Sequence, residues 1–323
     1  MQRLTSLFAR RLDDERGAAA VVLSLLLVPM LGFAAIAVDI GALYAERARL
    51  QVGADAAAIA VAQDCSRGNC GDMLATAQAL IDANDTEGTA AQPVLSSDPL
   101  SVTVTGGLPV EHWFAPVIGV DSTRVSATAT VGWGSPSRGT AVLPLTFSWC
   151  EFEQMTGGGV PSKEEDEDDV RTIYFTKTSN TTGCTGPSNN VVPGGFAYLD
   201  TPSGKCEAAS ARSERSYSKT GNSVPSDCST GDFSEWIGQT VLLPLFVESG
   251  ETGSNAWYQV YGYAAFKLTG YHLGGQYSAA FKPCSGNERC IAGYFTRFVE
   301  LSDAWDYSPD APQLGSSILR LIR

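Results

Sequence analysis

The stretch AAAVVLSLLLVPMLGFAAIAV, residues 18–38, decides the fold, because it runs for 21 residues without a charge. At about 1.5 Å per residue, a helix of this length spans roughly 30 Å, the thickness of the hydrocarbon core of a bilayer. A cleaved secretory signal has a shorter apolar region, of about 7–15 residues. Pro29 lies inside the run, and membrane helices tolerate an internal proline better than soluble ones do. The run therefore predicts a retained membrane-spanning helix, with a signal cleaved near residues 35–37 as the weaker alternative.

The charges that flank the run predict its orientation. The positive-inside rule places the flank rich in Lys and Arg in the cytoplasm, and acidic residues count for little in it. After the run, the nearest basic residues are Arg47 and Arg49. Before it, the leader of residues 1–17 carries Arg3, Arg10, Arg11 and Arg16. We therefore expect a cytoplasmic N-terminus, with everything after Val38 outside.

The charge balance beyond the leader agrees with an exported domain. The chain has 22 Lys and Arg against 35 Asp and Glu, and without residues 1–17 the balance is 18 against 32. So acidic a chain disfavours nucleic acid and anionic membrane surfaces as partners. We expect no nucleic-acid function.

Eight cysteines, an even number, all follow the apolar run. Outside a cell such a set predicts disulfides. A zinc site is disfavoured, because the chain has no C-x-x-C pair and only two histidines. Eight cysteines allow 105 pairings, and sequence alone does not choose among them. Short loops favour Cys65–Cys70 and Cys284–Cys290, which leaves Cys206–Cys228 and Cys150–Cys184.

The helix is expected to continue past the apolar run. The stretch DIGALYAERARLQVGADAAAIAVAQD, residues 39–64, has no proline and is dense in good helix formers. Two rows of residues recur on one face at seven-residue spacing: Ile40, Arg47, Ala54 and Val61, and beside them Leu43, Leu50 and Ala57. Two interpretations stay open. The segment lies on its own domain, or its small residues admit a second helix and form an assembly face.

A long helix, membrane-spanning and then amphipathic, behind a basic leader that ends in glycine, is the plan of a pilin-like protein. Residues 15–64 resemble the N-terminal segment of the TadE/TadG-like proteins of bacterial Flp (tight adherence) pilus assembly. The motif residues that carry the resemblance are Arg16, Gly17, Asp39, Gly41, Tyr44, Leu50, Gln51, Ala54, Asp55, Ala56, Ala57 and Ala60.

The resemblance implies a single-pass protein of the bacterial cytoplasmic membrane whose exported region serves pilus assembly or envelope attachment. Its implied partners are other Tad pilus-assembly membrane proteins or pilin-like helices. The alternative, from another class, is an exported binding module, adhesin-like, that the helix merely tethers.

The resemblance also raises the question of leader cleavage. Pilin-type leaders are cut after a glycine, here between Gly17 and Ala18, and the mature chain then typically carries a glutamate at its fifth position. Counted from Ala18, that position is Val22. The missing carboxylate disfavours both cleavage and filament packing, and we expect the leader to be retained.

The rest of the chain predicts an α+β organisation. Residues 70–85 predict a second short helix, and residues 96–135 a small strand–helix–strand unit whose helix is PVEHWFAPVIG, residues 109–119. GSPSRG, residues 134–139, predicts a turn-rich boundary. Short strands follow, and a helical pattern returns only in SSILRLIR, residues 316–323. The expected parts are a leader (1–17), a transmembrane helix (18–38), a helical stalk (39–95), the small unit (96–135) and a disulfide-stapled β-rich extracytoplasmic domain (136–323).

No motif in the chain predicts catalysis, a cofactor or a metal. The acidic run of residues 164–169 contains no glycine to bend a calcium loop, and DCSTG from Asp227 lacks the second serine of a metal-ion adhesion site. The usual hydrolase, zinc-protease and phosphate-loop signatures are missing. His112, placed in an apolar helix, and His272, at a strand end, are expected to be structural. We expect a structural protein without enzymatic activity, cofactor or small-molecule ligand.

Overall fold

The computed structural model describes residues 2–161, 170–179 and 183–322, with side chains from residue 19 onward. The helices are α1 (Gln2–Ser66), α2 (Met73–Asn84), α3 (Trp149–Thr156) and α4 (Thr230–Ser234), with short 3-10 turns η1 (Ala115–Ile118), η3 (Thr176–Thr178) and η4 (Gly253–Asn255). The strands are β1 (Thr89–Ala90), β2 (Val94–Ser97), β3 (Leu100–Glu111), β4 (Ser122–Ala141), β5 (Leu145–Ser148), β6 (Arg171–Tyr174), β7 (Cys184–Thr185), β8 (Val191–Val192), β9 (Phe196–Tyr198), β10 (Ala208–Ala211), β11 (Arg215–Tyr217), β12 (Thr240–Gly250), β13 (Trp257–His272), β14 (Cys290–Thr296), β15 (Phe298–Leu301), β16 (Asp306–Ser308) and β17 (Ser316–Ile322). The fold is α+β, as expected, with a long N-terminal apolar helix and a β-rich part that carries disulfides.

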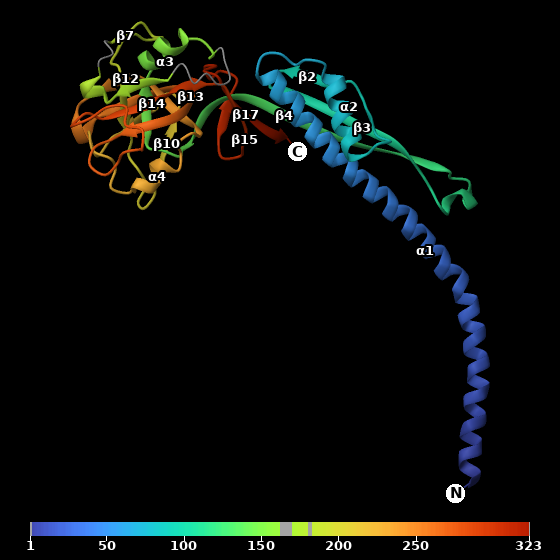
Figure 1. Ribbon diagram of the computed structural model, residues 1–323. Coiled ribbons are helices and arrows are strands. Elements are labelled where there is room, and N and C mark those ends of the chain that lie inside the picture. The colour runs from blue at the N-terminus through green and yellow to red at the C-terminus, as the bar shows by residue number, and fades with distance from the viewer. Residues whose placement is uncertain (1, 162–169, 180–182, 323) are drawn as a thin grey trace.

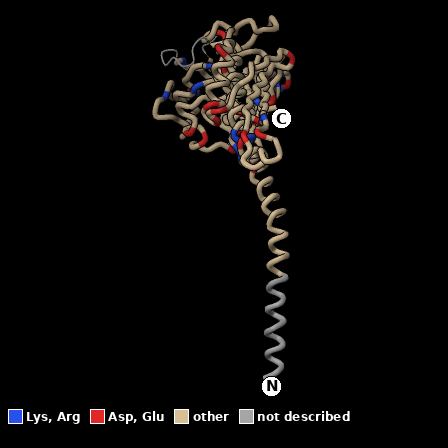
Figure 2. The backbone as a smooth tube through the Cα atoms, turned by 90° about the vertical axis from the view of Figure 1, so that its right-hand side faces the viewer, with Lys and Arg blue, Asp and Glu red and all other residues tan. Residues whose placement is uncertain are grey.

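Helix α1 leaves the folded part of the chain and projects far beyond it (Figure 1). Pro29 lies inside the helix without ending it. Among the described residues, α1 alone is long and apolar enough to cross a membrane, and no residue in its most apolar stretch of 18 residues is buried against the rest of the protein. Figure 2 shows the described part of this projection without Lys, Arg, Asp or Glu.

The second half of α1 packs on a sheet of its own chain. The sheet order is β1-β3-β4-β17-β15, and α2 lies beside α1 over the same sheet (Figure 1). Leu50, Ala57 and Val61 are fully buried in this first core. A Cβ added to Gly53 would lie 3.3 Å from the Ile81 Cα, so a small residue there lets α2 approach closely. The small-residue face therefore serves the protein's own domain, while Ile40 and Arg47, lower on the same row, are exposed.

The turn predicted at residues 134–139 is wrong, because these residues belong to β4. This strand pairs with β3 and β17 in its first part and with β10 and β16 in its last part, so it joins the two halves of the fold. Its glycines are packing positions and not turn residues. A Cβ added to Gly139 would overlap the ring of Trp305, and one added to Gly134 would lie 2.7 Å from the Tyr307 ring.

The second core is formed by residues from Ala141 onward. Its sheet has the order β6-β14-β13-β12-β5-β9, mostly antiparallel, with a parallel pair between β12 and β5. Four phenylalanine rings pack together at its centre in tilted and edge-to-face pairs, with the centroids of contacting rings between 4.8 and 6.2 Å apart. These rings are Phe147, Phe196, Phe266 and Phe295. The expected β-rich character of this part is confirmed.

All eight cysteines are in disulfides, as expected. Cys65–Cys70 closes the end of α1 onto the turn that leads to α2. The other three bonds lie in the second half: Cys150–Cys184, Cys206–Cys228 and Cys284–Cys290. The chain therefore carries covalent cross-links in both of its cores.

The C-terminal helix predicted from SSILRLIR is also wrong, since residues 316–322 form strand β17. The strand pairs with β4 on one side and with β15 on the other. Ile318 is fully buried in the second core, described above, and Leu319 in the first. An eight-residue apolar stretch has no strong helical preference of its own, and the open sheet edges on both sides decide its conformation.

Candidate functional site

The contact that best defines a site joins α1 to the far end of the β3–β4 hairpin. Asp39 accepts hydrogen bonds from three consecutive backbone N–H groups. Trp113 N lies 2.9 Å from Oδ1, Phe114 N lies 3.1 Å from Oδ2, and Ala115 N lies 2.8 Å from Oδ2. The carboxylate thus caps the first turn of η1, although the two lie at least 74 residues apart in the sequence.

Asp39 sits where the apolar run ends, and only 6% of its surface is exposed. Burial raises the pKa of this carboxyl, but the hydrogen bonds from Trp113, Phe114 and Ala115, together with the nearby His112, outweigh it and hold the pKa below its ordinary value. Asp39 is therefore ionised at neutral pH, and the ionised carboxylate is the form that best accepts all three hydrogen bonds.

The helix predicted over residues 109–119 is only partly present. Strand β3 runs on to Glu111, and the helical part is the single 3-10 turn η1. His112, expected in that helix, lies in the connection between them, with Nε2 2.8 Å from Thr123 Oγ1. We call residues 112–120 the hairpin tip. Its large apolar side chains point into open space: Trp113, Phe114, Val117, Ile118 and Val120.

Next to the tip, two other motif residues lie on the open side of α1. A Cβ added to Gly41 would meet nothing within 4 Å. Tyr44 is exposed and lines a shallow hollow of about 430 Å³ between α1 and β4. Arg47 of α1 and Arg124 of β4 line the same hollow. Apolar side chains therefore lie at the hairpin tip, and two guanidinium groups lie behind it, one on α1 and one on β4.

The remaining motif residues fix α1 to the sheet. Leu50 is fully buried in the first core. Gln51 Nε2 donates to Asp55 Oδ1 at 2.8 Å and to the Thr128 carbonyl at 3.2 Å. The motif thus divides into a part that docks the helix and a part that holds the hairpin tip. Arg16, Gly17 and Ala18 are helical in backbone, but their side chains are outside the described part of the chain.

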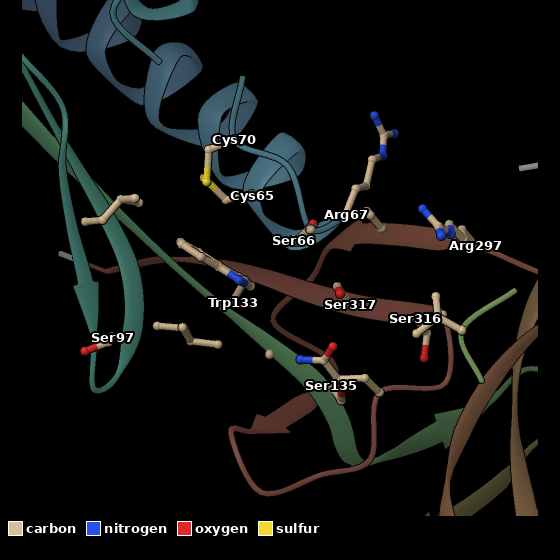
Figure 3. Close-up of a pocket in the computed structure, with 18 of the residues that line it drawn as sticks. Cys65, Ser66, Arg67, Cys70, Ser97, Trp133, Ser135, Arg297, Ser316 and Ser317 are labelled. Carbon is tan, nitrogen blue, oxygen red and sulfur yellow. A yellow bond between two sulfur atoms is a disulfide. The ribbon is translucent and has the colours of Figure 1, made fainter. Parts of the chain in front are cut away.

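A second hollow, of about 620 Å³, lies between the two cores (Figure 3). Trp133 and Ser135 of β4 and Ser316 and Ser317 of β17 line it, and Arg297 lies at one side. Two of its polar groups are already engaged, because Arg297 Nε donates to the Pro161 carbonyl at 2.6 Å and Ser316 Oγ to the Tyr263 carbonyl at 2.7 Å. Most of the exposed lining of the hollow is apolar, and its polar groups do not bring together an acid, a base and a nucleophile.

The other residues singled out in the sequence have structural partners. His272 has Nδ1 2.7 Å from Ser278 Oγ and Nε2 3.2 Å from the Gly286 carbonyl. Asp227 accepts from Gly204 N at 2.7 Å and from Thr201 Oγ1 at 3.1 Å, and these bonds lower its pKa.

The part of the chain with described placement contains no group of three or more His, Cys, Asp or Glu arranged to hold a metal ion. The acidic run, weighed above as a calcium loop, lies in residues 162–169, outside that part.

Comparison with known families matches the N-terminal segment. Residues 17–64 fit a family described as "Putative Flp pilus-assembly TadE/G-like". No curated protein and no solved structure matches the chain significantly. The segment expected from the motif residues is therefore confirmed as TadE/G-like. The match supports a role related to pilus assembly and suggests a structural rather than an enzymatic one.

Sequence reasoning found the motif residues but not the bond network around Asp39. The contact joins residues that are distant in the chain, and the sequence holds a single indication of it, the isolated charge of Asp39. Asp39 is the first charge after 22 uncharged residues, and a carboxylate at such a position needs partners.

Proposed function

We propose that this protein is a membrane-anchored accessory component of Flp pilus assembly, structural and not catalytic. The observation that carries the proposal is the TadE/G-like segment, residues 17–64, which covers the projecting apolar part of α1 and nearly all of its docked half. An unburied helix of this length needs an apolar environment, and a bilayer supplies it.

In this proposal α1 crosses the bacterial cytoplasmic membrane once, with residues 1–17 in the cytoplasm. Four arginines in the leader favour that orientation. Four disulfides favour an oxidising compartment for the folded part. We propose to divide the chain into leader (1–17), span (18–38), helical stalk (39–95), small sheet unit (96–135) and β-rich domain (136–323), with the last boundary lying within β4, which runs through both parts.

The proposed role uses α1 as a fixed support for the exported domain. The docked half of α1 is part of the first core and belongs to the same unbroken helix as the span. The sheet that packs on it therefore cannot rotate freely about the span. Other membrane proteins of Tad pilus assembly, or pilin-like helices, are the proposed partners. Val22 in place of a glutamate supports an anchor that retains its leader and stays out of the filament.

Deletion and complementation in a strain that makes Flp pili test the proposal. We expect deletion to reduce the pilin that shearing releases from the cell surface, and the full chain to restore it. A matched chain in which a cleaved export signal replaces residues 1–38 should be exported but should not restore pili. Normal pili in the deletion strain would refute the proposal.

The hollow between the two cores keeps the adhesin-like alternative open. In that case deletion would leave surface pilin unchanged and reduce only the attachment of cells to surfaces, so the same strains distinguish the two functions.

A further inference from the structure

We propose that the hairpin tip is a second membrane contact, which rests in the outer interface of the bilayer that α1 spans. The inference rests on the proposed function, because it takes α1 as a transmembrane helix. It assigns a lipid surface as the partner of the exposed apolar side chains of the hairpin tip.

The position of the tip along α1 is the first argument. The uncharged run ends at Val38, so Asp39 marks the edge of the hydrocarbon core when the run spans it. The three bonds to Asp39 place the backbone of residues 113–115 within 3.1 Å of its carboxylate oxygens. The tip and α1 therefore lie side by side at this level, as Figure 1 shows.

The side chains of the tip suit that level. Trp113 is 79% exposed, Val117 90% and Ile118 78%. Tryptophan and tyrosine are enriched at membrane interfaces, and Tyr44 lies on α1 five residues beyond Asp39, on the side away from the span. An exposed apolar cluster in water is unfavourable, whereas in the interface it continues the apolar surface of the span.

The backbone of the tip is prepared for a place with little water. Besides the three donors bound by Asp39, His112 N donates to the Asp121 carbonyl at 2.9 Å. Val117 N donates to the Phe114 carbonyl at 3.2 Å, and Gly119 N to the Pro116 carbonyl at 3.0 Å. Backbone groups that enter lipid must be satisfied internally, and these are.

Two basic side chains behind the tip suit the same placement, whereas two exposed acids, Glu111 and Asp121, flank the tip. Arg47 of α1 lies eight residues, or about 12 Å of helix, beyond Asp39 on the side away from the span, and Arg124 of β4 lines the same hollow. Their long side chains carry the guanidinium groups toward the level of the lipid phosphates, which Arg binds through paired hydrogen bonds. The chain as a whole has a net charge of −13, so an anionic bilayer would repel most of it. We therefore expect the contact to form on zwitterionic lipid and not to require anionic lipid.

Spin labels on the full-length protein test the inference, because every native cysteine is in a disulfide and an added one is the only free thiol. The protein is placed in vesicles of phosphatidylcholine, with one label at Val117→Cys, Leu25→Cys or Val191→Cys. Val191 is the matched control, since it is also valine, is 83% exposed and lies on β8 in the second half of the fold. Collision with oxygen, which prefers lipid, is compared with collision with a water-soluble nickel complex.

We expect the label at Val117 to favour oxygen, less strongly than Leu25, while Val191 favours nickel. If Leu25 favours oxygen but Val117 collides with nickel as often as Val191 does, the tip is in water and the inference fails while the anchor stands. If Val117 is shielded from both reagents, a protein covers the tip and lipid is overturned as its partner. If Leu25 itself favours nickel, α1 does not span, and the proposed anchor fails together with the inference.

Discussion

Replacement of Leu50 by alanine should loosen α1 from its sheet. Leu50 is fully buried, and its side chain fills the space left by a glycine of the facing strand, where a Cβ on Gly106 would lie 2.9 Å from Leu50 Cδ1. Leu50→Ala removes three carbon atoms, worth about 0.8 kcal/mol each, or about 2.4 kcal/mol in transfer free energy. The cavity adds to this loss, so we expect a cost of about 2–5 kcal/mol in the free energy of unfolding of the first core.

Hydrogen exchange followed by mass spectrometry measures this cost region by region in the detergent-solubilised full chain. A loss of about 2.4 kcal/mol raises the opening equilibrium by roughly 50-fold, since 1.4 kcal/mol is a factor of ten. We expect this acceleration in peptides of β3 and α2. Val52→Ala is the matched control, because Val52 lies on the same helix but is 58% exposed. The control should change stability by less than about 0.5 kcal/mol, or roughly twofold.

The comparison between the two variants decides whether the docked face of α1 carries this stability. If Leu50→Ala accelerates exchange in β3 no more than Val52→Ala does, the burial of Leu50 does not hold the helix, and the reasoning is refuted.

Three further predictions concern other parts of the fold. Because the pKa of Asp39 is lowered, its hydrogen bonds stabilise the hairpin tip fully at pH values above the ordinary carboxyl pKa of about 3.9, and this stabilisation is lost as the pH falls through the lower pKa of the folded state. Hydrogen exchange, corrected for the intrinsic rate, measures it; amide protection of the tip that is already lost at pH 6 would contradict the prediction. Loss of the bond at Cys150, which spans 34 residues, should cost about 1.5 kcal/mol more than loss of the bond at Cys284, which spans 6, in urea unfolding of the Cys→Ser variants. Gly139→Ala should lower the thermal midpoint, because its methyl group overlaps an indole ring, whereas Gly159→Ala, with nothing within 4 Å, should not.

The sequence could predict those parts of the fold that local chemistry decides. The uncharged run and the heptad rows beyond it define one continuous helix, and the eight cysteines after the run all pair. The motif residues also pointed to the right segment, since residues 17–64 carry the family match. In each case the signal lies within the segment itself.

The parts that were mispredicted depend on partners far away in the chain. Residues 134–139 look like a turn because five of the six are glycine, serine or proline, yet Tyr307 and Trp305 occupy the space beside their glycines and β4 continues through. Residues 316–322 form a strand because β4 and β15 offer edges on both sides. The bonds of Asp39 to the hairpin tip are of the same kind, and no local pattern reveals which loop a buried carboxylate will cap.

Mass spectrometry of the protein's N-terminus, in membranes and in sheared filaments from the same cells, tests the central claim most directly. An anchored assembly component keeps its leader, because the four arginines that hold α1 in place lie within residues 1–17. We predict N-terminal peptides that include Arg16 and Gly17 in the membrane fraction, and none of the protein in filaments. A dominant species that begins at Ala18 and is present in filaments would contradict the account and make the protein a filament subunit.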